Sequence, residues 1–488
     1  MSMYTRQSTA ELARGAGRAA ASGPLIEMSE PAEPASPHVG AVVLAAGQGT
    51  RMRSRLPKVL HPLAGVPMAG HVLAAARGAG AAEVVLVVGH GAAEVQQALG
   101  AQARYALQAE QRGTAHAVLQ ALPQLSPAIR RVLVLYGDTP LLRAATLREL
   151  VRAPAPLALL TAQVVAPQGY GRVVRDAAGR VRAVVEEADA TAEQRALCEI
   201  NVGAYAFDLD WLRAELPGLA PAPSGEYYLT ALVARAAERG VPIAAVPLAD
   251  PREGLGVNDR VQLAQAERVL QERLRERLLR AGVTLLDPDS VFLDATVEVG
   301  PDTTILPHTF LRGRTRIGAE CLIGPSTQIE DSVVGDRCRV QWSLVEGATL
   351  AGEVVVGPFA HVRPGSRLAR GVMIGNYAEV KNSVLHENVQ QHHFSYIGDA
   401  EVGRDTNVGA GTITCNYDGV RKHRTTIGER VFLGSDTLLV APVTLGDDSA
   451  TGSGAVVTRD VAPRTLVVGV PARVLRPTRG ADGTEEQR

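Results

Sequence analysis

The second half of the chain repeats aliphatic residues at intervals of six, and this spacing constrains the fold more than any other feature. The residues at this spacing are Val299, Ile305, Leu311, Ile317, Ile323 and Ile329, then Val356, Val362, Leu368, Ile374 and Val380, and then Ile427, Leu433, Leu439 and Leu445. A helix repeats every 3.6 residues and a strand every two, so neither explains this period. Each six-residue repeat forms one flat side of a left-handed parallel β-helix, and its aliphatic side chain points into a narrow triangular core. We therefore predict an all-β, left-handed parallel β-helix over residues 283–476, with loops leaving the coil at Val334, Val345 and residues 415–426.

The first half of the chain shows a different pattern, in which short apolar runs end at glycine. VVLAAG begins at Val42, VVLVVG spans Val84–Gly89 and VLVLYGD spans Val132–Asp138. Ala-rich segments of helical character separate these runs, so we predict buried parallel strands within one α/β domain over residues 40–260. Ligands of such sheets bind beyond the carboxyl ends of the strands.

Three further segments complete the predicted organisation. Strong helix formers with apolar residues at helical spacing predict a linker helix over residues 261–282. Residues 1–39 are rich in Ala, Ser, Pro and Glu, and residues 477–488 are polar, so both segments are predicted to be disordered.

Composition excludes several classes of protein. The net charge of −1 provides no general attraction for nucleic acid or an anionic membrane. No apolar run approaches the roughly 18 residues that span a bilayer. The four cysteines are too sparse for a disulfide scaffold and too far apart for a CxxC motif, which predicts reduced thiols in the cytoplasm. They are Cys198, Cys321, Cys338 and Cys415.

The segment LAAGQGTRM, residues 44–52, follows the first predicted strand and has the character of a phosphate-binding loop. Gly47 and Gly49 allow the backbone to approach a phosphate chain, while Arg51 and Lys58 add positive charge. The third glycine of the dinucleotide fingerprint and the Gly-Lys-Ser/Thr of a P-loop are both absent. The alternative interpretation is a plain Gly-rich turn.

Asp138 ends the third predicted strand, at the edge where an open α/β sheet binds its ligand. Mg²⁺ usually takes one or two protein ligands and completes its shell with phosphates and water. Asn258, in the segment GLGVNDR, is the candidate second ligand. An aspartate after glycine is also a common turn former, which is the alternative here.

Residues 40–475 resemble the bacterial bifunctional enzymes that acetylate glucosamine-1-phosphate and then uridylylate the product to UDP-N-acetylglucosamine. In the first half the resemblance is carried by Leu44–Gly47, Thr50–Met52 and Pro57–Lys58. It implies a Rossmann-like nucleotidyltransferase domain with a mostly parallel sheet. The residues implied to bind UTP and UDP-N-acetylglucosamine are Leu44, Ala45, Ala46, Gly47, Arg51, Lys58, Gln108, Gly113, Thr114, Tyr136, Gly137, Asp138, Gly171, Glu186, Asn201 and Asn258.

The resemblance also divides this set by role. Gln108, Gly113 and Thr114 would hold the uracil, and Tyr136, Gly137 and Asp138 would meet the ribose and the metal. Gly171, Glu186 and Asn201 would contact N-acetylglucosamine, while Asp138 and Asn258 would bind Mg²⁺. Gln48 departs from the family pattern, in which many members carry lysine.

The polar segments between Arg363 and Ser453 resemble the acetyltransferase half of the same family. The residues implied to bind glucosamine-1-phosphate are Arg363, Lys381, Tyr396 and Asn407, and those implied to bind acetyl-CoA are Ala410, Asn416, Tyr417, Ser435 and Ser453. His393 is implied to be the catalytic base. His392 and His393 would point to opposite faces of a strand, and the H-x-x-Y spacing to Tyr396 favours His393. Val470 replaces a family arginine expected at the CoA phosphates, and Arg473 is the candidate substitute.

The resemblance therefore implies a bifunctional transferase that supplies a precursor of cell-wall and lipopolysaccharide synthesis. It would use UTP and acetyl-CoA as co-substrates and Mg²⁺ as cofactor, and it would act as a cytoplasmic homotrimer without nucleic-acid or membrane partners. One alternative is a single-function sugar-1-phosphate nucleotidyltransferase with a structural β-helix. Another is a non-catalytic regulatory subunit, which the presence of Lys58, Asp138 and Asn258 disfavours.

Overall fold

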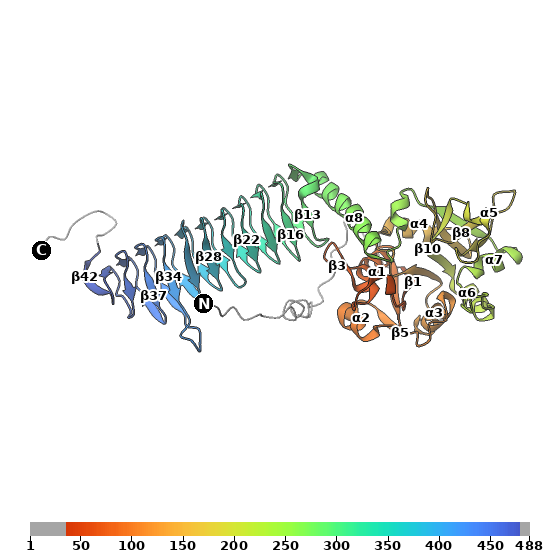
Figure 1. Ribbon diagram of the computed structural model, residues 1–488, viewed down its shortest axis with the longest axis horizontal. Helices are drawn as coiled ribbons and strands as arrows, with labels where there is room; N and C mark the ends of the chain where they lie inside the picture. Colours follow the sequence, from red (N-terminus) through yellow and green to blue (C-terminus); the bar gives the residue numbers. More distant parts are fainter. Residues whose placement is uncertain (1–35, 479–488) are drawn as a thin grey trace, which may run out of the picture. The chain divides into compact units, whose positions relative to one another are not determined.

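The computed structural model describes residues 36–478 of the 488-residue chain. The chain forms two compact units that divide between Leu270 and Gln271, within helix α8 (Arg260–Arg280; Figure 1). The disordered tails predicted at either end lie outside the described residues, except at their inner boundaries. Strand β1 begins at Ser36, so residues 36–39 of the predicted N-terminal tail are extended chain within a sheet.

The first unit contains a nine-stranded mixed sheet. Its main order is β11-β7-β10-β6-β1-β4-β5, and β8 and β9 branch from β10. Four of the six pairings along this order are parallel, and the two made by β10 are antiparallel. The strands are β1 (Ser36–Ala45), β4 (Ala81–Val88), β5 (Arg104–Leu107), β6 (Arg131–Tyr136), β7 (Leu157–Gln163), β8 (Arg172–Arg175), β9 (Val181–Val185), β10 (Glu199–Asp208) and β11 (Ile243–Pro247).

Helices cover both faces of this sheet, and β1 shows why its sequence is continuously apolar. Ala41 and Val43 belong to one core, with residues of α1, α2 and α4, while Val42 and Ala46 belong to the other, with residues of α3, α6 and α7. A strand buried on both faces needs apolar residues at successive positions. The helices are α1 (Met68–Gly78), α2 (Ala92–Leu99), α3 (Thr114–Ala121), α4 (Ala144–Arg152), α5 (Ala192–Arg195), α6 (Leu209–Glu215) and α7 (Ala231–Glu238). A hairpin of β2 (Pro62–Leu63) and β3 (Val66–Pro67) precedes α1.

The second unit is a left-handed parallel β-helix with three walls (Figure 1). The first wall contains β12 (Thr284–Leu285), β15 (Thr304–Ile305), β18 (Leu322–Ile323), β21 (Arg339–Val340), β24 (Val355–Val356), β27 (Met373–Ile374), β30 (Gln390–Gln391), β33 (Asn407–Val408), β36 (Phe432–Leu433), β39 (Ala450–Thr451), β41 (Thr465–Val468) and β42 (Arg473–Pro477). The second wall contains β13 (Phe292–Leu293), β16 (Phe310–Arg312), β19 (Gln328–Glu330), β22 (Leu344–Glu346), β25 (His361–Val362), β28 (Ala378–Lys381), β31 (Ser395–Gly398), β34 (Ile413–Cys415), β37 (Leu438–Val440) and β40 (Val456–Val457). The third wall contains β14 (Glu298–Val299), β17 (Arg316–Ile317), β20 (Val333–Val334), β23 (Thr349–Leu350), β26 (Arg367–Leu368), β29 (Val384–Leu385), β32 (Ala400–Val402), β35 (Thr425–Ile427) and β38 (Val443–Leu445).

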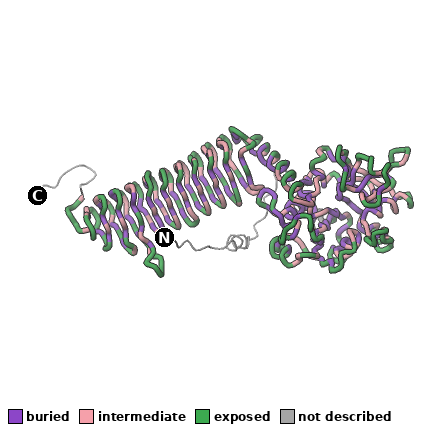
Figure 2. The backbone as a smooth tube through the Cα atoms, in the orientation of Figure 1, coloured by how far each residue is buried: buried purple, intermediate pink, exposed green. Residues whose placement is uncertain are grey.

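Equivalent strands of successive coils pair in parallel, as Leu311 does with Ile329, whereas the final strand β42 pairs antiparallel with β41. The aliphatic residues at six-residue spacing line the interior and are buried, apart from the half-buried Val299 in the first coil. Figure 2 shows the same alternation of buried interior and exposed corners along the coils. The predicted β-helix is therefore confirmed in its architecture.

The loops expected at Val334 and Val345 are the part of that prediction that is wrong. Both residues remain buried in the core, and the chain shortens one side of the coil by a single residue. Five positions separate Ile329 from Val334, and five separate Val340 from Val345. At the third expected break the chain does leave the coil, in a loop of residues 416–424 between β34 and β35.

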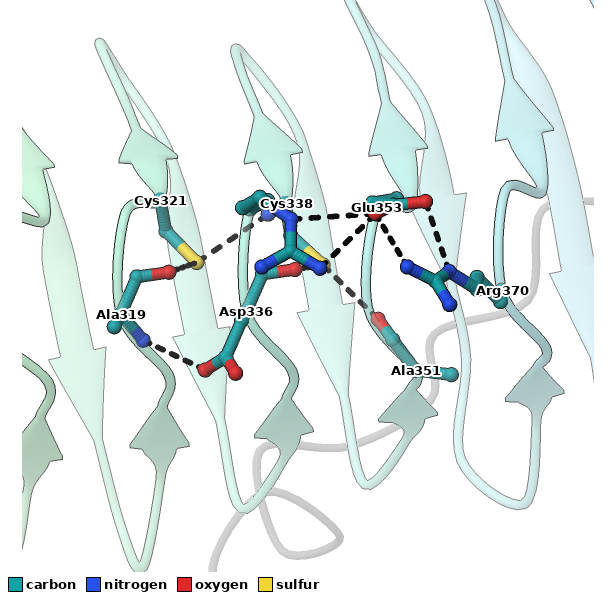
Figure 3. Close-up of polar contacts among 8 residues, drawn as sticks. Ala319, Cys321, Asp336, Cys338, Ala351, Glu353 and Arg370 are labelled. Carbon is teal, nitrogen blue, oxygen red and sulfur yellow. Dashed lines mark hydrogen bonds and ion pairs between the residues drawn. The ribbon is translucent and has the colours of Figure 1, made fainter.

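Stacked polar groups connect successive coils at the corner where the third wall meets the first, as Figure 3 shows. The backbone N–H of Cys338 donates to the Cys321 sulfur at 3.4 Å, and the Cys338 thiol donates to the Ala351 carbonyl at 3.0 Å. Glu353 accepts hydrogen bonds from Arg370 one coil further on. All four cysteines are free thiols.

No helix within residues 36–478 has both the length and the apolar character needed to span a membrane.

Candidate functional site

In the first unit, the expected phosphate-binding loop lies at the carboxyl ends of β1 and β6. Gly137 N donates to the Leu44 carbonyl at 2.9 Å, and Gln111 Nε2 donates to the Ala46 carbonyl at 2.7 Å. Ala45 and Ala46 are buried, whereas a Cβ atom added to Gly47 would meet no atom within 4 Å. The loop therefore presents an open backbone surface that a ligand can approach closely.

Gly49 allows this loop to pack against Lys58. Its φ is +63°, and a Cβ atom there would lie 2.5 Å from the Cβ atom of Lys58. Only glycine fits such a position without displacing its neighbour. Arg51, in the short 3₁₀ helix Thr50–Met52, is exposed at the same loop.

Lys58, Asp138 and Asn258 meet although they are far apart in sequence. Lys58 Nζ donates to a carboxylate oxygen of Asp138 and, at 2.9 Å, to Asn258 Oδ1. The two oxygen atoms thus converge on one cationic group, and oxygen ligands of this kind suit Mg²⁺. No cluster of three or more His, Cys, Asp or Glu residues that could hold a metal occurs among residues 36–478. The pair fits a Mg²⁺ ion that relies on substrate oxygens for the rest of its shell.

The residues expected to hold the uracil also lie together. Gln108 is buried, and its Nε2 donates to the Gly113 carbonyl at 3.0 Å. Gly113 has a φ of +102°, and a Cβ atom there would lie 2.6 Å from the Tyr227 carbonyl oxygen. Thr114 begins α3 and accepts a hydrogen bond from Leu229 N at 2.9 Å. The segment 226–230 therefore forms part of this end of the site, which the sequence reasoning missed.

The residues expected to contact the sugar meet at β10. Asn201 N donates to the Gly171 carbonyl at 2.9 Å, and a Cβ atom on Gly171 would lie 3.4 Å from a Glu186 carboxylate oxygen. Burial raises the pKa of Glu186, which accepts a hydrogen bond from the Thr230 hydroxyl at 2.8 Å. Glu186 and Asn201 can therefore offer hydrogen-bonding groups of different character to a sugar hydroxyl or amide.

Tyr136 and Tyr205 connect the sugar and metal ends of this site. Burial, and then the nearby Glu186 and Asp138 carboxylates, raise the pKa of Tyr136. The Tyr136 ring packs directly against Gly203, because a Cβ atom added to Gly203 would lie 2.6 Å from the ring carbons of Tyr136. The fully buried Tyr205 hydroxyl accepts a hydrogen bond from Asn201 Nδ2 at 2.7 Å. Tyr205 was also missed from the sequence, because its strand pattern is that of an ordinary core residue.

In the second unit, four of the predicted residues form one straight row. His393, Ala410, Ser435 and Ser453 occupy the same position of successive coils, at the edge where the first wall meets the second, which we call the first edge. The Ala410 carbonyl accepts a hydrogen bond from Asp436 N at 2.6 Å, and the Ser435 carbonyl accepts one from Gly454 N at 2.8 Å. With about 4.8 Å per coil, the row extends about 14 Å.

His392 and His393 do not lie in a strand, so the prediction that strand alternation points them to opposite faces is wrong. Both residues lie between β30 and β31, at the first edge, and both are exposed. Their rings meet edge to face with centroids 6.4 Å apart. The two histidines differ in which residue of the next coil they are aligned with, and only His393 is aligned with Ala410 and so belongs to the row.

A cluster of cationic groups lies at the opposite edge of the second wall, which we call the second edge. The neighbouring Lys422 ammonium is the main cause that lowers the pKa of Lys381, and Arg363 acts in the same direction. Arg363 also pairs with Glu379 at 2.7 Å. Because like charges repel, this cluster is suited to an anionic group such as a phosphate. Lys422 comes from the loop of residues 416–424 and was not predicted.

Tyr396 and Asn416 lie beside this cluster. Asn416 Nδ2 donates to an Asp399 carboxylate oxygen at 2.5 Å and to the Tyr396 hydroxyl at 3.4 Å. Asn416 is buried, whereas Tyr417 is exposed, with its hydroxyl donating to the Gly419 carbonyl at 2.6 Å. Within one chain, the residues predicted to bind acetyl-CoA are therefore divided between the two edges. Ala410, Ser435 and Ser453 lie at the first edge, whereas Asn416 and Tyr417 lie at the second.

The last predicted residues lie on the first wall. Asn407, in β33, pairs with Gln390 and Phe432 on the strands before and after it, and it leads directly to the first edge. Val470 is exposed and Arg473 pairs with Val468 at the final coil, near the end of the same edge. The arginine is therefore placed close to the continuation of the row.

Comparisons with known proteins agree with both halves of this description. Residues 41–204 match a family model described as a MobA-like NTP transferase domain, and residues 424–459 match one described as a hexapeptide repeat of succinyl-transferase. The chain is 50% identical over 433 residues to the bifunctional protein GlmU of Heliobacterium modesticaldum, covering 88% of this chain and 94% of that protein. It is 50% identical over 436 residues to the bifunctional protein GlmU of Trichlorobacter lovleyi, and 51% identical over 437 residues to that of Azotobacter vinelandii, in each case covering 88% of this chain and 95% of the relative.

These matches confirm the resemblance drawn from the sequence motifs, and they cover most of the chain. The chain belongs to the GlmU family of bifunctional proteins.

Proposed function

We propose that the chain produces UDP-N-acetylglucosamine in two steps, one at each unit. The second unit transfers the acetyl group of acetyl-CoA to glucosamine-1-phosphate, and the first transfers a uridylyl group from UTP to the resulting N-acetylglucosamine-1-phosphate. The observation that carries this proposal is the grouping of the expected contacts around two separate sites. Each unit holds a cationic group at its site, Lys58 in the first and Arg363 with Lys381 and Lys422 in the second.

In the acetyl transfer, the chain must remove a proton from the amine of glucosamine-1-phosphate. His393 is the proposed base, because a neutral imidazole can accept that proton near pH 7. Acetyl-CoA is proposed to extend from His393 along the row of Ala410, Ser435 and Ser453, and Arg473 stands near its end. The amine nitrogen attacks the thioester carbonyl, and CoA leaves as its thiol.

The separation of the two edges supports a site that is shared between copies of the chain. His393 lies at the first edge, whereas Arg363 and Lys381 lie at the second, with the four residues of β31 between the edges. At about 3.3 Å per residue these span about 13 Å, which is more than one hexose phosphate covers. A neighbouring copy that contributes its second edge would bring the phosphate site to the base.

A row of exposed aromatic residues offers the contact surface for such copies. Trp342, Phe359, Tyr377 and Phe394 follow one another on successive coils beside the first edge, and they are between 42% and 66% exposed. The rings of Phe359 and Tyr377 stack with centroids 5.4 Å apart. Contiguous exposed apolar surface of this kind is typical of an interface between chains. Three copies of a triangular prism can each contribute one edge to a neighbour, so we propose a homotrimer.

In the uridylyl transfer, the phosphate of the sugar is already ionised at neutral pH, so no general base is required. The protein's task is to hold two anions together in line. Mg²⁺, when bound at Asp138 and Asn258, would neutralise phosphate charge at the α-phosphorus of UTP. Arg51 and Lys58 supply further positive charge, and Glu186 and Asn201 orient the sugar. Pyrophosphate leaves.

The four free thiols support a cytoplasmic location for this chemistry. The alternative of a single-function nucleotidyltransferase is disfavoured by the cationic cluster at the second edge, since a purely structural coil gains nothing from mutually repelling lysines.

The substitution Asp138→Asn tests the division of labour between the two units. It should abolish uridylyl transfer and leave acetyl transfer unchanged, measured in separate assays that detect pyrophosphate and free CoA. Light scattering on the same sample should give about three times the chain mass of 51.4 kDa. Loss of both activities with the mass unchanged would contradict independent sites, and a mass of one chain would contradict the shared acetyltransferase site.

A further inference from the structure

Lys58 lies between the two oxygen atoms that are proposed to bind the divalent cation. Its Nζ atom donates to an oxygen of Asp138 and, at 2.9 Å, to Asn258 Oδ1. Only 14% of the Lys58 side chain and 22% of the Asp138 side chain are exposed. The ammonium group therefore neutralises the carboxylate and already occupies the position where the divalent cation would bind.

Lysine is rare in this chain, which makes its presence at position 58 informative. The chain contains 50 Lys and Arg residues, and the lysines among them are Lys58, Lys381 and Lys422. All three lie at one of the two proposed sites, and arginine supplies the positive charge everywhere else. An ammonium is a compact charge on a flexible stem, whereas a guanidinium is planar and wide. A lysine at position 58 can therefore fit between the two metal ligands and can also rotate away from them, which the wider guanidinium of an arginine could not do.

We infer that the Lys58 ammonium and a divalent cation compete for the position between Asp138 and Asn258. This inference rests on the proposed function, because it takes those two residues as the metal ligands. Without nucleotide, Lys58 holds the position and the free ion binds weakly. The phosphate oxygens of UTP attract the ammonium group away from Asp138 and Asn258, so nucleotide binding clears the position for the ion. Metal and nucleotide binding are then positively coupled, and the coupling is mutual.

The competition gives Lys58→Met opposite effects on two ligands. Methionine keeps an unbranched stem but removes the charge and both hydrogen bonds. Mn²⁺ alone should bind the variant at least about tenfold more tightly than it binds the unsubstituted chain, because the ion no longer displaces a charge-assisted pair. UTP without metal should bind the variant at least about tenfold more weakly, because a phosphate contact is lost. Free Mn²⁺ is measured by electron paramagnetic resonance and UTP by titration calorimetry, both on the full chain.

Two further variants serve as controls. Arg51→Met removes an exposed positive charge from the same loop and should weaken UTP binding while leaving Mn²⁺ affinity unchanged. Asp138→Asn in the Lys58→Met background should abolish the gained Mn²⁺ binding. Equal or weaker Mn²⁺ binding by Lys58→Met, with that binding still dependent on Asp138, would overturn the competition and leave the metal site intact. Mn²⁺ binding that is independent of Asp138 would overturn the metal site of the proposed function as well.

A measurement on the unsubstituted chain follows the Lys58 ammonium group directly, and a variant serves only to assign its signal. With lysine labelled by ¹⁵N, the three side-chain ammonium groups give few signals, and Lys58→Arg assigns the signal of Lys58. UTP should shift the Lys58 signal, and the further addition of Mg²⁺ should leave it in the shifted position. A Lys58 signal that stays unchanged when UTP and Mg²⁺ are both present would show that the ammonium never leaves, and the inference would be wrong.

Discussion

Tyr205→Phe is predicted to disturb the sugar end of the nucleotidyltransferase site while leaving its shape unchanged. The Tyr205 hydroxyl accepts a hydrogen bond from Asn201 Nδ2 at 2.7 Å, and Asn201 Oδ1 accepts one from Gly203 N at 3.3 Å. These two contacts fix which way the Asn201 amide faces. Phenylalanine removes only the hydroxyl oxygen, so the amide loses one of its two anchors, and Tyr136 loses its hydrogen bond to the same hydroxyl.

The magnitude follows from burial. Tyr205 is fully buried and Asn201 is 7% exposed, so water cannot replace the lost acceptor. An unsatisfied buried donor costs about 1–3 kcal/mol, and we expect the first unit to lose stability by that amount. If the freed amide no longer faces the sugar, one neutral hydrogen bond to substrate, about 0.5–1.5 kcal/mol, is lost as well. The KM for N-acetylglucosamine-1-phosphate should then rise about two- to tenfold, with the KM for UTP unchanged.

The assay can follow the first unit by itself. The chain has two tryptophans, Trp211 in α6 and Trp342 in the β-helix. In a Trp342→Phe background, fluorescence of Trp211 reports the urea unfolding of the first unit, and Trp211 stacks on Phe207 with ring centroids 6.2 Å apart. Tyr105→Phe is the matched control, because its hydroxyl donates to the Gly100 carbonyl at 2.6 Å near the surface. That control should change stability by less than about 0.5 kcal/mol.

Two results would refute this reasoning. Stability that changes no more in Tyr205→Phe than in the Tyr105→Phe control would mean that Asn201 does not depend on the buried hydroxyl. A loss of stability without any change in the KM for the sugar phosphate would mean that the Asn201 amide does not face the sugar.

The remaining predictions concern three other features of the chain. His393→Ala should lower acetyl transfer by about 10² to 10⁴ and leave uridylyl transfer intact, whereas His392→Ala should do little; a larger loss in His392→Ala would reverse the assignment. Burial lowers the pKa values of His61 and His71, so as the pH falls the unfolded state binds more protons than the folded state does. The free energy of unfolding of the first unit, measured by urea titration, should therefore be highest above about pH 6.5 and decrease below it. A free energy of unfolding that does not change between pH 7 and 5 would contradict this. Gly113→Ala should weaken UTP binding in calorimetry, because its φ of +102° and a Cβ contact of 2.6 Å with backbone exclude a side chain; unchanged affinity would show that this turn does not shape the uracil end.

The β-helix could be predicted from sequence because its core is built from local repeats. Each aliphatic residue contacts its equivalents one coil away, as Leu311 does with Ile329, so the period itself specifies the fold. The corners were less predictable. At Val334 and Val345 the sequence shows only a missing residue, and whether the chain forms a loop or a tighter corner depends on packing between coils.

The sites could be predicted only where a motif carries them. The loop of residues 44–52 and the ends of the strands were recognisable because their residue types serve phosphate and metal chemistry. Thr230, Tyr205 and Lys422 were missed, since each is an ordinary residue until the fold places it beside Glu186, Asn201 or Lys381.

By itself, the sequence determined the two architectures, the family and the residue types available for chemistry. Periodicity and short motifs are local properties, so they survive without knowledge of the fold. The tertiary structure alone decided which groups meet. Lys58, Asp138 and Asn258 converge across separations of 80 and 200 positions, and His393 joins a row that crosses three further coils. Such contacts depend on sheet order and coil register, which follow from the packing of the whole unit and are not encoded at any single position.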